Sequence, residues 1–212
     1  MKSLRSLQEL IFPSRCIGCS ALGLEICSQC RRSWHPHIYR SWSHTAPHFP
    51  IFSAIPYSPI AGKVILSAKE NGILSADRLI VSALKHALRY SIEEKGEATL
   101  VPIPSRKSVA RLRGRQFITE LSRQLSRETG LPLCENLRHT RVVKDQSSLD
   151  ARSRFANIDG ALISQKFFSG KAFLIDDLVT TGATLNEAAR ALRMQGIEVA
   201  AAVTACVAEP LR

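Results

Sequence analysis

The strongest constraint on the fold is a stretch of thirteen residues, AFLIDDLVTTGAT, at 172–184. Four apolar residues come first and are followed by two adjacent acids, Asp176 and Asp177, two apolar residues and a run rich in threonine. A short apolar run of this kind is typical of a fully buried strand, and residues 184–195 have the spacing of an amphipathic helix that Gly196 ends. The stretch therefore predicts a strand, a turn and a helix in immediate succession.

The same alternation of strand and helix extends over most of the chain. Apolar patterns predict strands at 51–57, 99–104, 172–175 and 199–206, and helices at 61–70, 75–89, 116–129 and 184–195. An amphipathic helix at 3–12 and one helical turn at 149–155 complete the prediction. Strands that alternate with helices form a mostly parallel sheet with helices on both faces, so the expected class is α/β.

The chain changes character near residue 50. Four cysteines, several histidines and three prolines precede this point, which favours irregular structure there. We therefore expect a small N-terminal module at 1–50 and an α/β domain at 51–212. Cys134 and Cys206 stand alone and are interpreted as small apolar core residues.

The composition, with 45% hydrophobic and 22% charged residues, is that of an ordinary globular protein. No apolar run is long enough to cross a bilayer, and Gln8, Glu9 and Arg15 interrupt any signal-peptide region, so we expect a cytoplasmic protein without membrane insertion. Residues 101–155 carry +7 of the formal net charge of +11. This excess suits a phosphate-rich partner or, equally, a solvated basic face.

Two pairs of cysteines, Cys16 with Cys19 and Cys27 with Cys30, have two residues between the members of each pair. Each pair can direct two thiolates at one point, and four thiolates match the closed tetrahedral shell of structural zinc. Unpaired buried thiols and redox-active pairs are the alternatives. Two matched pairs in a chain expected in a reducing compartment favour zinc, because a redox motif normally needs only one pair.

The turn after the predicted strand has the features of a phosphate site. In an open parallel sheet, ligands bind beyond the carboxyl ends of the strands. Unpaired N–H groups at the start of the next helix favour an anion, and hydroxyl groups add donors. The residues of this predicted cradle are Thr180, Thr181, Gly182, Ala183 and Thr184.

The two acids suit a different part of the same ligand. Carboxylates repel phosphate, but an ionised carboxylate accepts two hydrogen bonds and so matches the vicinal diol of a ribose. Asp176 and Asp177 beside the cradle therefore predict a ribose 5-phosphate. The chain has neither G-x-x-x-x-G-K-[ST] nor G-x-G-x-x-G, and two aspartates that merely cap a helix would explain only one of the two acids.

The stretch 172–184 resembles the phosphoribosyl-pyrophosphate (PRPP) motif of type I phosphoribosyltransferases. Together with the two cysteine pairs, it makes the chain similar to the ComF family of competence-associated, phosphoribosyltransferase-like proteins. The similarity continues at Tyr57, Lys69 and Gly72, through Val101-Pro102-Ile103-Pro104, at Arg113-Gly114, and in the spacing of Leu137, Gln146, Leu149, Arg154, Asn157, Gly160 and Ala161. It implies a type I phosphoribosyltransferase-like sheet plus a zinc-ribbon-like module of four cysteines at the N-terminus.

The resemblance also implies how PRPP is held. The turn after Pro104, at Ser105 and Arg106, would hold the pyrophosphate with backbone amides, and a basic loop within 105–115 that carries Arg111 and Arg113 would close over it. Mg²⁺ would bridge the pyrophosphate and the ribose hydroxyls. Asp176, Asp177 and Arg113 are the expected catalytic residues, because displacement at the anomeric carbon depends on positioning and electrostatics.

Two functions from different classes follow from this resemblance. One is an enzyme that transfers phosphoribose from PRPP to an acceptor and releases pyrophosphate, with a link to DNA uptake. The other is a non-catalytic PRPP-sensing module that binds single-stranded DNA or proteins of the competence machinery. The basic side chains at 138–154 fit an acceptor region, a nucleic-acid path or a solvated face, and the acceptor and the oligomeric state are left open.

Overall fold

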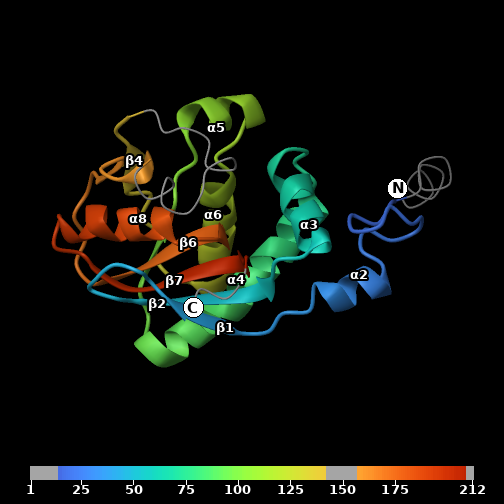
Figure 1. Ribbon diagram of the computed structural model, residues 1–212, viewed down its shortest axis with the longest axis horizontal. Helices are drawn as coiled ribbons and strands as arrows, with labels where there is room; N and C mark the ends of the chain where they lie inside the picture. Colours follow the sequence, from blue (N-terminus) through green and yellow to red (C-terminus); the bar gives the residue numbers. More distant parts are fainter. Residues whose placement is uncertain (1–13, 142–156, 209–212) are drawn as a thin grey trace.

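The computed structural model describes residues 14–141 and 157–208 (Figure 1). The strands are β1 (Tyr39–Trp42), β2 (Pro50–Pro56), β3 (Thr99–Pro102), β4 (Leu137–His139), β5 (Leu162–Ser164), β6 (Lys171–Val179) and β7 (Glu198–Val207). The helices are α2 (Ser28–Ser33), α3 (Pro59–Lys69), α4 (Leu74–Lys95), α5 (Lys107–Arg113), α6 (Phe117–Thr129) and α8 (Ala183–Arg193).

Five strands form the central sheet in the order β1-β2-β7-β6-β3. The pairs β2 with β7, β7 with β6 and β6 with β3 are parallel, and only the edge strand β1 is antiparallel. This arrangement confirms the mostly parallel sheet that the alternation of strands and helices predicts. β4 and β5 form a separate antiparallel pair.

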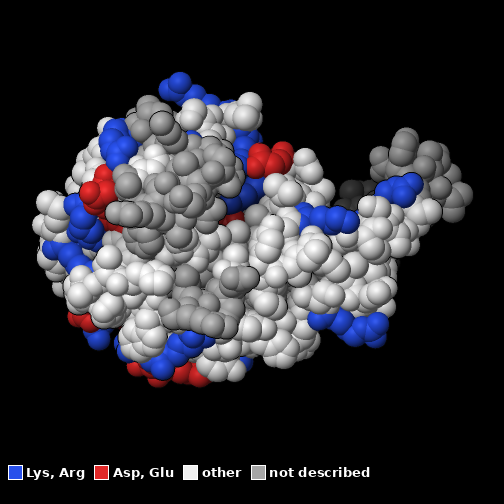
Figure 2. Space-filling view, in the orientation of Figure 1, with Lys and Arg blue, Asp and Glu red and all other residues white. Residues whose placement is uncertain are grey.

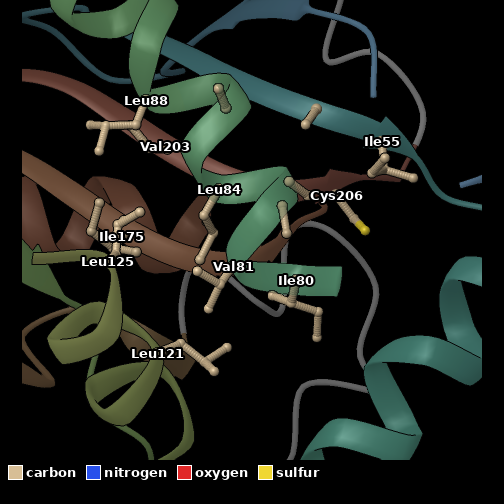
Figure 3. Close-up of a cluster of buried hydrophobic side chains, with 14 of the residues drawn as sticks. Ile55, Ile80, Val81, Leu84, Leu88, Leu121, Leu125, Ile175, Val203 and Cys206 are labelled. Carbon is tan, nitrogen blue, oxygen red and sulfur yellow. The ribbon is translucent and has the colours of Figure 1, made fainter. Parts of the chain in front are cut away.

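The side chains of β6 alternate between two cores, as the twofold period of a strand requires. Phe173 and Ile175 pack with α3, α4 and α6 on one face, whereas Ala172 and Leu174 pack with α8 on the other. Figure 3 shows the first core, where Leu84 of α4 points toward the sheet and lies near Leu125 of α6. The near-continuous apolar sequence of β6 follows from burial on both faces.

Several elements differ from the sequence prediction. The region before residue 50 is not wholly irregular, because it contains α2 and β1, and the weakly patterned region after residue 130 contributes β4 and β5. The predicted helices at 3–12 and 149–155 lie outside the described residues. Within the described ranges, no helix is long and apolar enough to cross a membrane.

Figure 2 shows how charged side chains are distributed on one face of the molecule. On the face in Figure 2, the Lys and Arg side chains of the described residues lie in several separate groups around the edge. Figure 1 shows α3 between the central sheet and the N-terminal segment that carries α2. This helix consequently lies between the cysteine-rich segment and the carboxyl ends of the strands.

Leu84 provides a test of the core. Its side chain is fully buried, and we expect Leu84→Ala to lower the free energy of unfolding by about 2–5 kcal/mol, because the truncation leaves a cavity. Leu112→Ala is the control, since that leucine is 88% exposed and its truncation should change stability by less than about 0.5 kcal/mol. Urea unfolding followed by circular dichroism measures both, and equal effects would contradict this placement of the core.

Candidate functional site

Asp176 and Asp177, here called the acidic pair, lie on β6 just beyond its last pairing with β3. The pairing of β6 with β3 ends at Pro102 and Ile175, apart from one further bond in which Ile103 N–H donates to the Ile175 carbonyl at 2.9 Å. Pro104 has no N–H with which to continue the ladder. On its other side, β6 stays paired with β7 through Val179, so the strand runs beyond the predicted 172–175.

Beside the pair lies a cavity of about 250 Å³. Two carboxylates and three cationic side chains line it, together with residues from the turn after β3, from β4 and from the helices α5, α6 and α8. Its predicted site residues are Asp176, Asp177, Thr184, Ser105, Arg106 and Arg113. Lys69, His139, Ile103, Pro104, Val109, Ile118 and Ile158 complete the lining. The structure thus brings together six residues that lie up to 79 positions apart in the sequence.

Asp177 is buried and forms an ion pair with Lys69 at the end of α3. The Nζ of Lys69 lies 2.6 Å from the Oδ2 of Asp177, and the two side chains are 25% and 5% exposed. Burial alone would lower the pKa of Lys69, but the charges of Asp177 and Asp176 outweigh it and raise the pKa above its usual value. The resemblance to the ComF family includes Lys69 but assigns it no role.

Asp176 has a different environment, because successive residues of a strand point to opposite faces. Its Oδ1 accepts the backbone N–H of Asp177 at 2.9 Å. Burial, and then the negative charge of Asp177, raise the pKa of Asp176 well above its usual range, while Lys69 opposes the shift. A positive group near the cavity therefore favours the ionised form of Asp176.

The predicted cradle forms the start of α8. Gly182 has the left-handed φ of 71°, which glycine adopts without strain, and α8 begins at the next residue without a side-chain cap. Its carbonyl accepts the side-chain amide of Asn186 at 3.0 Å, and Asn186 in turn accepts the Thr45 hydroxyl at 2.5 Å. Thr184 faces the cavity of the acidic pair, whereas Ala183 lines a separate cavity on the outer side of α8.

The basic segment after β3 is the main correction to the sequence prediction. Residues 107–113, which we expected in a loop, form the helix α5, because Ala110, Leu112 and the arginines favour helix and Gly114 ends it with a φ of 69°. Arg113 lines the cavity and forms a bidentate ion pair with Glu70. In this pair, the Nε–H of Arg113 donates to the Oε2 of Glu70 at 3.0 Å. Arg111 lines a neighbouring cavity of about 640 Å³ instead.

His139 of β4 is a site residue that the sequence prediction missed. Its Nε2 lies 3.1 Å from the carbonyl oxygen of Pro104, and its buried Nδ1 has no hydrogen-bond partner among the described residues. Burial lowers the pKa of His139, so the ring is neutral and the Nε2–H donates to Pro104. This bond joins β4 to the turn that carries Ser105 and Arg106, and no local sequence pattern signals it.

The four N-terminal cysteines come together as their spacing predicts. The sulfur atoms of Cys16, Cys19, Cys27 and Cys30 all lie within 4.8 Å of one another. The Cys19 and Cys27 sulfurs are 3.7 Å apart, and tetrahedral Zn–S bonds of about 2.3 Å place sulfurs about 3.8 Å apart. The donor set therefore fits a zinc ion.

The shared site shifts the pKa values of Cys16 and Cys30 in opposite directions. Burial would raise the pKa of Cys16, but hydrogen bonds, chiefly from the Cys27 N–H, lower it to about 6. Burial and the neighbouring sulfurs raise the pKa of Cys30 to about 12. Gly18 is required for the close packing, since a Cβ there would lie 2.6 Å from the Cys30 sulfur, and its carbonyl accepts a hydrogen bond from Lys63 of α3 at 2.8 Å.

Three of the arginines in 105–138 are paired with carboxylates within the protein. Arg115 bonds Asp77 at 2.9 Å and also Glu120, and Arg123 bonds Glu135 at 2.6 Å. Together with the Arg113–Glu70 pair, these contacts leave less positive charge for a nucleic acid than the sequence count suggests. Binding of single-stranded DNA stays a prediction.

A parallel sheet with an acidic pair and a helix start at the carboxyl edge defines the class of protein. The family model for the phosphoribosyl transferase domain matches residues 74–210, and the chain belongs to this family. Within it, the chain is similar to Competence protein F of Haemophilus influenzae, with 32% identity over 126 residues. The matched part is 57% of this chain and 55% of that protein, so the chain spans about half of its relative. These findings confirm the expected ComF-like type.

Replacing one cysteine tests the metal site. We expect the wild-type chain to hold about one zinc ion and Cys27→Ser to lose most of it, because a hydroxyl is a poor ligand for zinc. Serine still offers an oxygen to the Cys30 N–H at the start of α2, so the helix cap is preserved. Zinc content by mass spectrometry is the measurement, and Cys134→Ser, outside the cluster, is the control. Unchanged zinc in Cys27→Ser would contradict the assignment.

Proposed function

We propose that the chain binds PRPP with Mg²⁺ and transfers its phosphoribosyl group to an acceptor, with release of pyrophosphate. The observation that carries the proposal is the cavity that joins the acidic pair, Thr184 at the start of α8, and Ser105 with Arg106 after β3. These three parts match, respectively, the diol, the 5-phosphate and the pyrophosphate of PRPP. The membership of the phosphoribosyl transferase family supports the same ligand.

The phosphate end of the ligand would bind at α8. The first turn of this helix contains no acidic residue, and Gly182 offers no side-chain cap, so the positive end of the helix dipole faces an anion. The Ala183 N–H makes only a long bond of 3.4 Å to the Thr181 hydroxyl. The αL conformation of Gly182 turns the chain from β6 into the helix over a few residues. Thr180, Thr181 and Thr184 add hydroxyl donors beside these amides.

The ribose would lie over β6. Ionised Asp176 and Asp177 accept hydrogen bonds from its two hydroxyls, and their negative charge stabilises the positive charge that develops on the sugar as the C1–O bond breaks. The pyrophosphate would face Ser105 and Arg106. Arg113 can exchange its bond to Glu70 for a pyrophosphate oxygen, because the guanidinium binds carboxylate and phosphate with the same fork.

The reaction replaces one bond at the anomeric carbon. The bond from C1 to the pyrophosphate oxygen breaks with its electron pair, and a lone pair of the acceptor forms the new bond to C1, after which the acceptor loses a proton. Mg²⁺ would be held by PRPP oxygens and by Asp176, the one carboxylate of the pair without a lysine partner, and would offset charge on the departing pyrophosphate. The protein side chains supply position and electrostatics.

The substitution Asp176→Asn tests this proposal and leaves the Lys69–Asp177 ion pair intact. We expect its affinity for Mg²⁺–PRPP to fall about 10- to 100-fold, the scale of a lost hydrogen bond to a charged group. Isothermal titration calorimetry measures the affinity. Glu198→Gln is the control, since Glu198 is an exposed carboxylate at the opposite end of β7.

An acceptor screen tests the transfer itself. We expect pyrophosphate release from PRPP that depends on one added acceptor and is lost in Asp176→Asn, because both depend on the same ionised carboxylate. A coupled pyrophosphate assay over nucleobases and related heterocycles is the measurement. Wild-type protein that binds no PRPP would overturn the whole proposal, whereas binding without release for any acceptor would overturn the transfer alone.

A further inference from the structure

Asn186 is an unusual residue for its position in α8. Its side chain is buried in the first turns of the helix. Asparagine is a poor helix former, and a buried amide costs free energy unless both its donor and its acceptor are paired. Both are paired here, because the Nδ2–H donates to the Gly182 carbonyl at 3.0 Å and the Oδ1 accepts the Thr45 hydroxyl at 2.5 Å. The side chain therefore joins the residue before α8 to the segment between β1 and β2.

The two partners also fix the orientation of the Asn186 amide. The Thr45 N–H, which lies 3.3 Å from the Oδ1, can only donate, and the Gly182 carbonyl can only accept. The amide oxygen consequently faces Thr45 and the amide nitrogen faces Gly182. The same carbonyl accepts the backbone N–H of Asn186 at 2.9 Å. One residue thus donates two hydrogen bonds to the Gly182 carbonyl oxygen, which has two lone pairs.

Holding the Gly182 carbonyl also sets the direction of the next N–H group. A peptide unit is planar and trans, so the Gly182 carbonyl and the Ala183 N–H point in opposite directions. With the carbonyl directed along α8 toward Asn186, the Ala183 N–H is directed out of the start of the helix. There it makes only a long bond of 3.4 Å to the Thr181 hydroxyl. This N–H is the first of α8 and belongs to the predicted phosphate cradle.

Gly182 alone would hold this peptide weakly. It has a left-handed φ of 71° and no side chain, and glycine has more conformational freedom than any other residue. The ends of helices also open more readily than their centres. The side chain of Asn186 adds a second bond to the carbonyl that the helix already holds, and it therefore restricts rotation of the peptide between Gly182 and Ala183.

The segment that carries Thr45 is itself held in place. The Ser43 N–H donates to the Phe49 carbonyl at 3.0 Å, and the Phe49 N–H donates to the Ser43 hydroxyl oxygen at 2.9 Å. Arg193, at the end of α8, donates to the Pro47 carbonyl at 2.6 Å. Thr45 lies between these contacts and before the residues that match the phosphoribosyl transferase domain. A segment outside the matched residues therefore supports the start of α8.

We propose that Asn186 is a positioning residue, which holds the peptide between Gly182 and Ala183 so that the Ala183 N–H is directed at the 5-phosphate of the ligand. The role rests on the proposed function for its ligand. Asn186 acts through the Gly182 carbonyl and needs no contact with the ligand itself. Thr184, one residue beyond Ala183, lines the cavity of the acidic pair, so the start of α8 adjoins the proposed ribose site.

The alternative role for Asn186 is only to attach the segment between β1 and β2 to α8. That role predicts the same effect on ligand binding from any substitution that loosens this segment. Ser43→Ala is the matched control, because it removes the hydroxyl that accepts the Phe49 N–H and leaves the net charge and the Asn186–Gly182 bond unchanged. A comparison of the two substitutions therefore separates positioning from attachment.

Calorimetric titration with ribose 5-phosphate tests the role in binding, because this probe carries the 5-phosphate and no pyrophosphate. We expect Asn186→Leu, which is similar in size, to bind about tenfold more weakly than wild type, since a misdirected N–H loses a hydrogen bond to a charged group. Ser43→Ala should bind as tightly as wild type. Wild-type affinity in Asn186→Leu would overturn the proposal, and so would equal losses in the two variants.

Nuclear magnetic resonance without ligand tests the positioning separately. A hydrogen bond that a carbonyl accepts moves its carbon resonance downfield. We therefore expect the Gly182 carbonyl resonance to move upfield in Asn186→Leu and to stay in place in Ser43→Ala. An unchanged Gly182 resonance in Asn186→Leu would overturn the proposal. If wild type binds neither ribose 5-phosphate nor PRPP, the proposed function fails, whereas this measurement still decides whether Asn186 orients the peptide.

A second substitution, Asn186→Ala, covers the case in which Asn186→Leu does not fold. It removes the same donor without placing a large apolar side chain against Thr45. We expect the same weaker binding of ribose 5-phosphate and the same upfield shift of the Gly182 resonance. Folded Asn186→Ala with wild-type affinity would overturn the proposal. Failure of both variants to fold would also overturn it, because Asn186 would then serve the fold and not the ligand.

Discussion

The site depends on the unequal lengths of the two ladders of β6. On one side the pairing with β3 ends at Ile175, and on the other side β7 stays paired through Val179. The strand therefore carries Asp176 and Asp177 past the last pairing with β3 while its backbone remains fixed by β7. In a loop, the two carboxylates would repel each other and could adopt many orientations. In a paired strand, the backbone fixes the direction of each side chain, with one on each side of the sheet.

Two carboxylates held close together and partly buried repel each other, and other groups of the site offset this repulsion. The carboxylate on the side of α3 is paired with Lys69, and the other accepts a backbone N–H. The end of α3 has a further role, since Glu70, next to Lys69, binds Arg113 of α5. One dipeptide thus holds an acid from β6 and a base from α5, and the helix that carries it also contacts the cysteine module through Lys63. The module and the cavity consequently share a structural support.

The sequence predicts those parts that local patterns encode. The apolar run before Asp176 predicts a buried strand, Gly196 and Gly130 mark helix ends, and the spacing of the cysteines predicts their cluster, because each signal depends on neighbouring residues. The partner of Asp177 lies more than a hundred residues earlier, at the end of a helix whose sequence is ordinary. Its role depends on tertiary packing, which no local period encodes. The helix α5 was missed for a different reason, since a basic run between a proline and a glycine is also typical of a solvated loop.

Ion pairs between arginines and acids reduce the positive charge that this chain offers to a polyanion. A net charge of +11 predicts attraction of a polyanion at long range, but Arg113, Arg115 and Arg123 each have a carboxylate partner in the folded protein. A phosphate that binds such an arginine must displace a carboxylate that makes a similar bidentate contact. The favourable free energy of phosphate binding is therefore smaller than for a guanidinium without a partner. Specific binding would then require the phosphates to be placed by other groups first, and the amides at the start of α8 are suited to this, because the Ala183 N–H would give up only a long bond of 3.4 Å to the Thr181 hydroxyl. The arginine exchange at Glu70 would therefore follow the binding of the sugar phosphate, because only a ligand already held at α8 and β6 presents its pyrophosphate to α5.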